Sequence, residues 1–321
     1  MIDANEFKGV QDFLYYRQVR DDIRAYLDGT KELIKAETTH FGQYDYHFKW
    51  LKGEITGFAG IPNHGKSKFT IFLSALKMYY SDWKIAVYSP ETSPSEFLFA
   101  NYLHTLSGKG MFGKNKPTKK EIAPFEELLE NNLFLCDPEK MPTVKGIMNR
   151  FRQAHEYHGC DMFIIDPFNC LDREWEMSQR DDRYVGDFLD KYRDFAKHTN
   201  TCGVVVSHPK GGMKPKKDSL DYECPTGYDL AGGAMWMNKL DNLVFIHRPN
   251  FIGEFKDTSV LARHSKIKKR EIVGQGGDAF LHFDFRTNRY AIDGIAPDFG
   301  TKNVQAIDVS EPSRDEDELP F

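Results

Sequence analysis

The sequence is poor in cysteine and lacks any long apolar run. Its 321 residues include five cysteines, and no two of them form the C-x-x-C pair that zinc sites and thiol redox sites use. We therefore expect reduced thiols rather than a disulfide framework. No stretch approaches the roughly 18 apolar residues of a membrane span, and the N-terminus lacks the charged-then-apolar plan of a secretory signal. These absences predict a cytoplasmic protein with no membrane contact.

The chain also lacks a strong net charge of either sign. Its formal charge is −5, and residues 311–321 hold five acidic residues and one arginine, which accounts for −4 of that total. The remainder is nearly neutral, so binding to nucleic acid would depend on local lysines rather than on a global field. The acidic end, EPSRDEDELPF, cannot pack into a core, and we expect a disordered tail there.

Hydrophobic periodicity divides the chain into three expected parts. Residues 1 to about 40 show helical spacing, with Gly29 as a stop, so residues 1–50 are predicted to form a helical linker or oligomerisation segment. Residues 51–300 alternate between apolar strands and amphipathic helices, and residues 301–321 form the tail. Such alternation predicts an α/β fold with a mostly parallel central sheet flanked by helices. From sequence alone, the N-terminal helix packs either on its own core or on a neighbouring molecule.

The expected elements can be given by residue range. Strands are predicted over 54–60, 84–91, 132–137, 162–167, 202–209, 242–249, 259–268 and 279–285. Helices are predicted over 67–81, 93–106, 144–158, 181–199 and 231–239, with a Gly/Lys-rich loop over 107–120.

A phosphate-binding motif is the strongest local signal. The segment GIPNHGKS fits G-x-x-x-x-G-K-[ST], follows an apolar strand and opens a helix, as the motif requires. Its glycines let backbone N–H groups approach phosphate oxygens, and the helix N-terminus favours negative charge. Lys66 is expected on the β- and γ-phosphates of ATP, and the Ser67 hydroxyl on Mg²⁺. The predicted nucleotide-binding residues are Gly60, Ile61, Pro62, Asn63, His64, Gly65, Lys66, Ser67 and Lys68.

Three further polar residues stand at predicted strand ends. Asp166 closes an all-apolar strand, where a carboxylate is costly unless it meets a cation, so it is a candidate Mg²⁺ ligand. Glu91 is a candidate base that activates the attacking water. His208 is placed to contact the γ-phosphate and report its loss. The alternatives are a helix cap for Asp166, an ordinary strand-end glutamate for Glu91, and a solvated or capping histidine for His208.

Two basic segments are candidates for anion contact. The loop HPKGGMKPKKD is flexible and rich in lysine, which suits sequence-independent contact with a phosphate backbone, although a solvated surface loop is the alternative. In KIKKREIVGQGG, strand alternation would put Lys266, Lys268 and Arg270 on one face, where a phosphate from an adjacent subunit could offset their repulsion. A lysine-guarded edge strand is the alternative there.

Six motifs in order resemble the DnaB-like hexameric replicative helicases, especially the Twinkle-like branch found in organelles, bacteria and phages. The motifs are GIPNHGKS, YSPET, FIIDPFN, VVVSHPKGGMKPKK, GYDLAGGAMWMNKLDNLVFIHRP and KIKKREIVGQGGDAFL. The resemblance implies a RecA-like ATPase that moves 5′ to 3′ on single-stranded DNA as a homo-hexamer or similar ring. It would place the protein in a cytoplasm, that of the host if a phage encodes it.

The resemblance also implies residue roles. It gives ATP and Mg²⁺ to Lys66, Ser67 and Asp166, catalysis to Glu91, and γ-phosphate sensing to His208. Both Lys268 and Arg270 align with the arginine-finger position, and we favour Arg270 because its planar fork suits phosphate. The implied DNA-binding residues are Lys210, Lys214, Lys216, Lys217, Gly232 and Gly233.

The acidic tail resembles the Pro-Phe-ending tips of single-stranded-DNA-binding proteins. Its terminal aromatic and carboxylate could dock on a polymerase, a primase or another replisome protein, whereas the alternative is a merely solubilising tail. Two other functions stay open for the whole chain. One is a RecA-like recombinase or regulatory ATPase that does not unwind DNA, and the other is a non-catalytic loader or binding module that uses ATP only to assemble.

Overall fold

The structure is a computed structural model that describes residues 16–31, 34–113, 116–137, 143–172, 180–211, 221–252 and 257–300. The chain divides into two compact units, Met1–Lys35 and Ala36–Phe321. Within the described residues, no helix is long and apolar enough to span a bilayer.

The first unit contains helix α1 (Tyr16–Leu27). Three of its large apolar side chains, those of Tyr16, Ile23 and Leu27, are exposed. The helix ends just before Gly29, whose φ of 69° is the left-handed conformation that glycine adopts readily at a helix C-terminus. The predicted stop at Gly29 is confirmed, whereas the helical spacing that continues to about residue 40 forms no helix in the described residues 34–40.

The second unit is built on one sheet. Among the described residues it has nine strands in the order β3-β2-β4-β5-β1-β6-β7-β8-β9. The strands are β1 (Ile55–Ala59), β2 (Ile85–Tyr88), β3 (Leu133–Leu135), β4 (Met162–Ile165), β5 (Cys202–Ser207), β6 (Asn242–His247), β7 (Ser259–Ile267), β8 (Gly277–Asp284) and β9 (Arg289–Ile292).

The pairing of neighbouring strands changes once across this sheet, from parallel to antiparallel. The strands from β3 to β6 pair in parallel, and β6, β7, β8 and β9 pair antiparallel. Every residue of β1, β2, β4, β5 and β6 is buried, as expected for parallel strands covered on both faces. The predicted mostly parallel α/β fold is thus confirmed.

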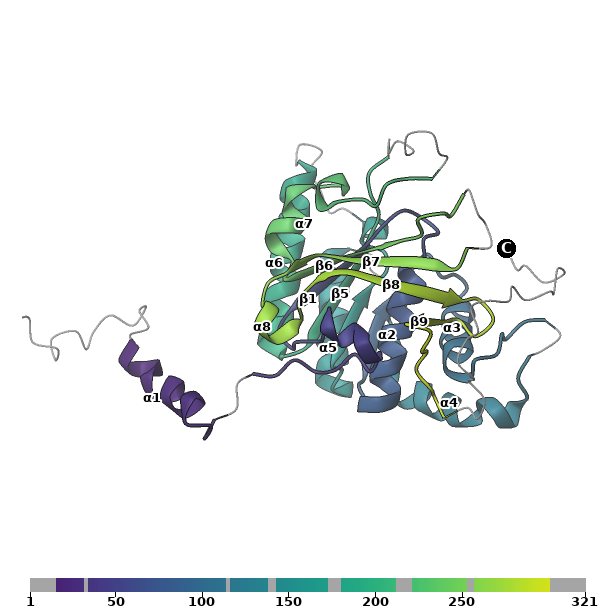
Figure 1. The fold of residues 1–321 in the computed structure, drawn as a ribbon, viewed down its shortest axis with the longest axis horizontal. Coiled ribbons are helices and arrows are strands. Elements are labelled where there is room, and N and C mark those ends of the chain that lie inside the picture. The colour runs from purple at the N-terminus through teal and green to yellow at the C-terminus, as the bar shows by residue number, and fades with distance from the viewer. Residues whose placement is uncertain are drawn as a thin grey trace, which may run out of the picture. The chain divides into compact units, whose positions relative to one another are not determined.

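Helices cover both faces of the sheet (Figure 1). The helices are α2 (Lys66–Ser81), α3 (Glu96–Ser107), α4 (Lys119–Asn132), α5 (Val144–His158), α6 (Asp181–Thr199), α7 (Ala234–Lys239) and the short α8 (Arg270–Val273). One hydrophobic cluster joins the sheet to α2, α3 and α4, and the other joins it to α5, α6 and α7. The two clusters lie on opposite faces because side chains alternate along each strand.

The segment before β1 belongs to the core of this unit. Phe41, Tyr44, Phe48 and Trp50 are buried and pack against α2 and the sheet around the short turn η1 (Gly42–Tyr46). Backbone hydrogen bonds between Glu37 and Trp50, at 2.6 and 2.8 Å, hold the segment in place.

Helix α4, the short helix α8 and strand β9 were not predicted from the sequence. Helix α4 begins at the end of the segment predicted as a loop, where Thr118 and Glu121 form a reciprocal capping box. Strand β9 adds an edge beyond the last predicted strand. Its Arg289 is fully buried and donates hydrogen bonds to the carbonyl oxygens of Thr105 and Leu106 at the end of α3, at 2.8 and 2.7 Å.

Candidate functional site

Four neighbouring parallel strands bring the predicted catalytic residues to one edge of the sheet. In the order β2-β4-β5-β1, the residues that follow these strands include Glu91, Asp166, His208 and Gly60. Parallel strands have their carboxyl ends at the same edge, and this edge is where open α/β sheets bind ligands. The fold therefore collects residues that are far apart in the sequence.

The phosphate loop runs from Gly60 into the N-terminus of α2. Gly60 has a φ of 151°, and a Cβ there would lie 2.3 Å from the carbonyl oxygen of Ile246, so only glycine fits against β6. Gly65, at φ 95°, is left-handed and starts the helix. The N-terminus of a helix that follows such a loop favours anions.

Lys66 is folded back over this loop. Its ammonium group donates a 2.8 Å hydrogen bond to the carbonyl oxygen of Ile61, and the side chain is buried. Burial lowers the pKa of Lys66 to about 8, although Asp166 and Glu91 act in the opposite direction. A buried cation beside a glycine turn and a helix N-terminus suits a polyanionic ligand.

The loop is braced from two later strands. The His64 imidazole accepts a 3.0 Å hydrogen bond from the backbone N–H of Arg248 through Nδ1, and the Tyr290 hydroxyl donates to the carbonyl oxygen of Gly65 at 3.0 Å. Burial, with His247 next in effect, lowers the pKa of His64 to about 3, so the ring is neutral and can accept. His64 thus has a positioning contact, and Tyr290 was not anticipated from the sequence.

Lys68, the last residue of the predicted nucleotide-binding set, is half-buried. Its ammonium donates to the side-chain oxygen of Asn101 on α3, and burial lowers the pKa of Lys68 to about 8.

Asp166 and Ser67 form the pair of oxygen groups expected of a magnesium site. The Ser67 hydroxyl donates to Asp166 Oδ1 at 3.1 Å. Asp166 is 7% exposed, and burial raises its pKa to about 6. Mg²⁺ prefers such hard oxygen ligands and usually takes only one or two from the protein, with water and phosphate completing its shell. The donor set therefore fits Mg²⁺. Among the described residues no group of three or more His, Cys, Asp or Glu side chains could hold a metal.

Glu91 and His208 face each other across the same edge. Their Oε2 and Nε2 atoms are 3.9 Å apart, and 56% of the Glu91 side chain is exposed. Burial, with Lys66 next in effect, lowers the pKa of His208, although Glu91 acts in the opposite direction.

Two residues that follow Asp166 extend this contact. The Cys170 thiol donates to Glu91 Oε1 at 3.6 Å, and the Asn169 side-chain oxygen accepts a 3.3 Å hydrogen bond from the backbone N–H of His208. Neither residue was assigned a role from the sequence. Both residues lie in the turn directly after Asp166, and this position next to a predicted site residue was the signal that could have found them.

The predicted DNA-contact residues are described only in part. Lys210 is exposed, and its backbone N–H donates to the carbonyl oxygen of Asp229 at 2.9 Å. Gly232 and Gly233 have φ values of 82° and 44° just before α7, and a Cβ on Gly232 would lie 2.7 Å from a methyl group of Val185. Backbone shape and packing therefore require glycine at residue 232. Lys214, Lys216 and Lys217 lie outside the described residues.

The prediction that three cations share one strand face is wrong. Strand β7 ends at Ile267, so Lys268 and Arg270 lie beyond it, and Arg270 begins α8. The Lys266 ammonium donates to the carbonyl oxygen of Met237 at 2.6 Å.

Two lysines in this turn pair with buried carboxylates. The Lys268 ammonium lies 3.0 Å from Asp241 Oδ1, and that of Lys269 lies 2.9 Å from Glu54 Oε1. Arg270 is exposed.

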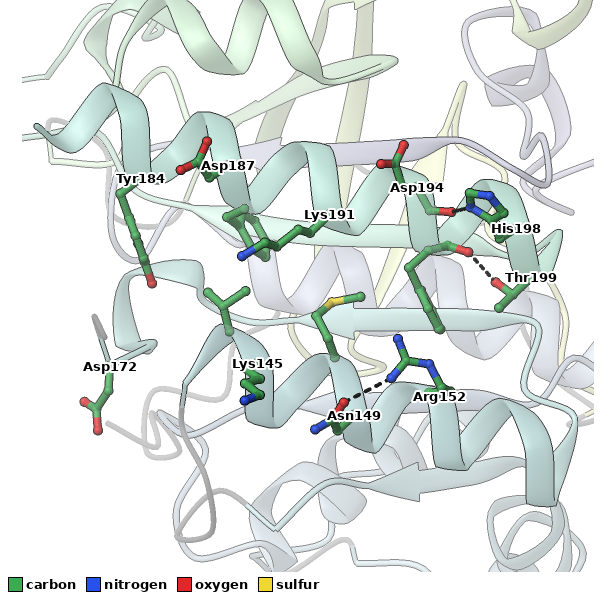
Figure 2. Close-up of a pocket in the computed structure, with 14 residues that line it drawn as sticks. Lys145, Asn149, Arg152, Asp172, Tyr184, Asp187, Lys191, Asp194, His198 and Thr199 are labelled. Atoms are coloured by element: carbon green, nitrogen blue, oxygen red, sulfur yellow. Dashed lines mark hydrogen bonds between the residues drawn. The ribbon is translucent and has the colours of Figure 1, made fainter. Parts of the chain in front are cut away.

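A groove lies between α5 and α6, with a volume of about 590 Å³. Figure 2 shows its rim, where Lys145, Asn149 and Arg152 of α5 face Lys191 and the neighbouring polar residues of α6. None of the predicted site residues lines it.

Comparison with known proteins bears on this arrangement. No protein-family model matches the chain. The chain is 27% identical over 291 residues to the Twinkle homolog protein, chloroplastic/mitochondrial, of Arabidopsis thaliana, an alignment that covers 88% of this chain and 40% of the relative. The chain therefore spans about two fifths of that protein's length.

Two solved structures share the fold. One, an ATPase domain, matches with a TM-score of 0.70 at 14% identity, over 88% of this chain and 99% of that one. The other is a DnaB-like replicative helicase, whose structure was described together with its interactions with primase. It matches with a TM-score of 0.66 at 15% identity, over 87% of this chain and 67% of that one. The chain is thus similar in sequence to a Twinkle homolog protein, and it shares an α/β ATPase-domain fold with both solved structures.

Proposed function

We propose that the chain is the motor of a replicative DNA helicase, which hydrolyses ATP to move 5′ to 3′ on single-stranded DNA. The observation that carries the proposal is the convergence of the phosphate loop, the Ser67–Asp166 pair and the Glu91–His208 pair at one sheet edge. An ordinary glycine turn would not bring two carboxylates and a histidine to a buried lysine.

Each group has a distinct task in this proposal. Backbone N–H groups of the phosphate loop and of the α2 N-terminus bind the phosphates of ATP, and Lys66 moves from the Ile61 carbonyl to the β- and γ-phosphates. Mg²⁺, held by Ser67 and Asp166, would neutralise charge on the phosphates. Glu91 is exposed enough to reach a water molecule and orient it toward the γ-phosphate.

His208 would link the phosphate to DNA. It lies beside Glu91 and directly precedes the segment with Lys210, so loss of the γ-phosphate changes the contacts at one end of that loop. Lys210, Lys214, Lys216 and Lys217 would contact DNA phosphates, and Gly232 and Gly233 would allow close approach of the backbone.

A neighbouring subunit would complete the site in a hexamer or similar ring. Arg270 is the better candidate for the cation that reaches across, because Lys268 already pairs with the buried Asp241 within its own chain. The exposed apolar side chains of α1 suit docking on a neighbour and hold the ring together in this proposal. The acidic tail, outside the described residues, would bind a replisome protein.

Unwinding of a forked DNA duplex with ATP and Mg²⁺ tests the proposal. Wild type should separate the strands, and Lys66→Ala should lower ATP turnover by about 100-fold or more and abolish unwinding. ATP turnover without unwinding would instead favour the recombinase or regulatory ATPase. Absence of both activities, with ATP needed only for assembly, would favour a loader module.

A further inference from the structure

A tyrosine with no assigned role stands exposed next to the proposed DNA-contact loop. Tyr228 lies in the three-residue turn η3 (Gly227–Asp229), and 65% of its surface is exposed. A large aromatic side chain gains nothing in the folded monomer from such exposure. The position is therefore suited to contact with a ligand.

The turn that carries Tyr228 is tightly fixed. Asp229 Oδ2 accepts hydrogen bonds from both the backbone N–H and the hydroxyl of Thr226, each at 2.7 Å. A Cβ on Gly227 would lie 2.4 Å from Met237 Cγ, so the turn packs directly on α7. A ring held on a rigid turn loses little conformational entropy when it binds.

Backbone pairing sets Tyr228 beside Lys210. Pro209 and Leu230 form an antiparallel bridge, and the Lys210 N–H donates to the Asp229 carbonyl oxygen at 2.9 Å. Tyr228 directly precedes Asp229 in the turn, so it lies one residue from this backbone contact with Lys210. The cation and the ring are thus presented from two adjacent segments that are tied together.

We propose that Tyr228 stacks on a base of single-stranded DNA while Lys210 contacts a phosphate of the same strand. The proposal rests on the proposed function and names a residue of its DNA-binding surface. Every base has a π-face, so stacking adds affinity without sequence preference. A lysine next to the ring supplies the salt-dependent part of the affinity.

Binding to two oligonucleotides tests this role. One is a single-stranded oligothymidine, and the other has the same backbone without bases. Affinities are measured with Mg²⁺ and a non-hydrolysable ATP analogue, for wild type, Tyr228→Ala, Tyr228→Phe and Lys210→Ala. Tyr157→Ala is the matched control, because Tyr157 is 79% exposed near the end of α5, which precedes β4 and so lies toward the opposite edge of the sheet.

The expected pattern separates the ring from the cation. Tyr228→Ala should bind oligothymidine about 10-fold to 100-fold more weakly, bind the baseless strand like wild type, and keep the salt dependence of wild type. Tyr228→Phe should restore binding to oligothymidine. Lys210→Ala should weaken binding to both strands and reduce the slope of log affinity against log salt by about 1.

Other outcomes overturn the proposal. If Tyr228→Ala binds oligothymidine like wild type, or weakens both strands equally, Tyr228 does not stack on bases. If it loses self-association while the assembled fraction binds DNA normally, the ring belongs to a protein interface. If wild type binds neither strand, the proposed function fails, and the role of Tyr228 fails with it.

Discussion

Asp166→Asn should stabilise the protein in the absence of metal, although it removes a proposed Mg²⁺ ligand. Asp166 is 7% exposed, and burial raises its pKa from 3.8 to about 6. Asparagine has nearly the same shape, carries no charge and still accepts the Ser67 hydrogen bond. The substitution therefore removes the cost of a buried charge and keeps the contact.

The size of this stabilisation follows from the raised pKa of Asp166. An acid whose pKa is raised by folding binds protons more tightly in the folded state, so its contribution to stability falls as pH rises between the unfolded and folded pKa values. For Asp166 this window lies between 3.8 and about 6. Above about pH 6 the buried charge of Asp166 destabilises the fold by its full amount, about 3 kcal/mol, because a pKa difference of one corresponds to about 1.36 kcal/mol. The variant lacks this loss.

Urea unfolding with a metal chelator measures the effect. The advantage of Asp166→Asn over wild type should grow from about 1 kcal/mol near pH 4.5 to about 3 kcal/mol near pH 7.5. With Mg²⁺ and ATP present, wild type should gain stability and the variant should gain much less. A variant no more stable than wild type near neutral pH would refute the reasoning.

Three further substitutions test separate parts of the structure. Glu91→Gln should lower ATP turnover by about 100-fold or more with nucleotide affinity kept; turnover near that of wild type in steady-state kinetics would show that Glu91 is not the base. Arg289→Met leaves two carbonyl oxygens at the end of α3 without donors, so urea unfolding should show a loss of about 2–5 kcal/mol, and a smaller loss would mean that water replaces the guanidinium. Lys268→Ala should destabilise the fold because it leaves the buried Asp241 carboxylate without its cation. Arg270→Ala should impair ATP turnover with little change in melting temperature. The opposite pattern would make Lys268 the cation that reaches the neighbouring site.

Local patterns predicted most of the parallel sheet and its helices. Helices α5 and α6 have the predicted bounds, because each carries a continuous amphipathic pattern between clear ends. Helix α4 was missed although Thr118 and Glu121 carry its capping box, since the basic residues before it and Pro124 within it are typical of a loop. Strand β9 has only four residues, and its buried Arg289 donates from Nε and Nη2 to carbonyl oxygens of a distant helix, which no local pattern reveals.

In the candidate site, too, local patterns predicted some residues, whereas contacts between distant residues were missed. The residues at strand ends could be predicted because each follows an apolar run, and parallel strands must place their carboxyl ends together. The contact of Tyr290 with Gly65 joins residues 225 positions apart, so no local pattern indicated it. The cation-rich strand was mispredicted because β7 ends at Ile267, and the lysines beyond it pair with Asp241 and Glu54, which are also remote in sequence.

ATP turnover per protomer, measured across a dilution series together with the oligomer mass, tests the shared site most directly. If Arg270 of one subunit completes the site of the next, turnover should follow the assembled fraction and fall to near zero in the monomer. Arg270→Ala should assemble normally yet show no rise in turnover on assembly. A monomer as active as the assembled form would contradict the account.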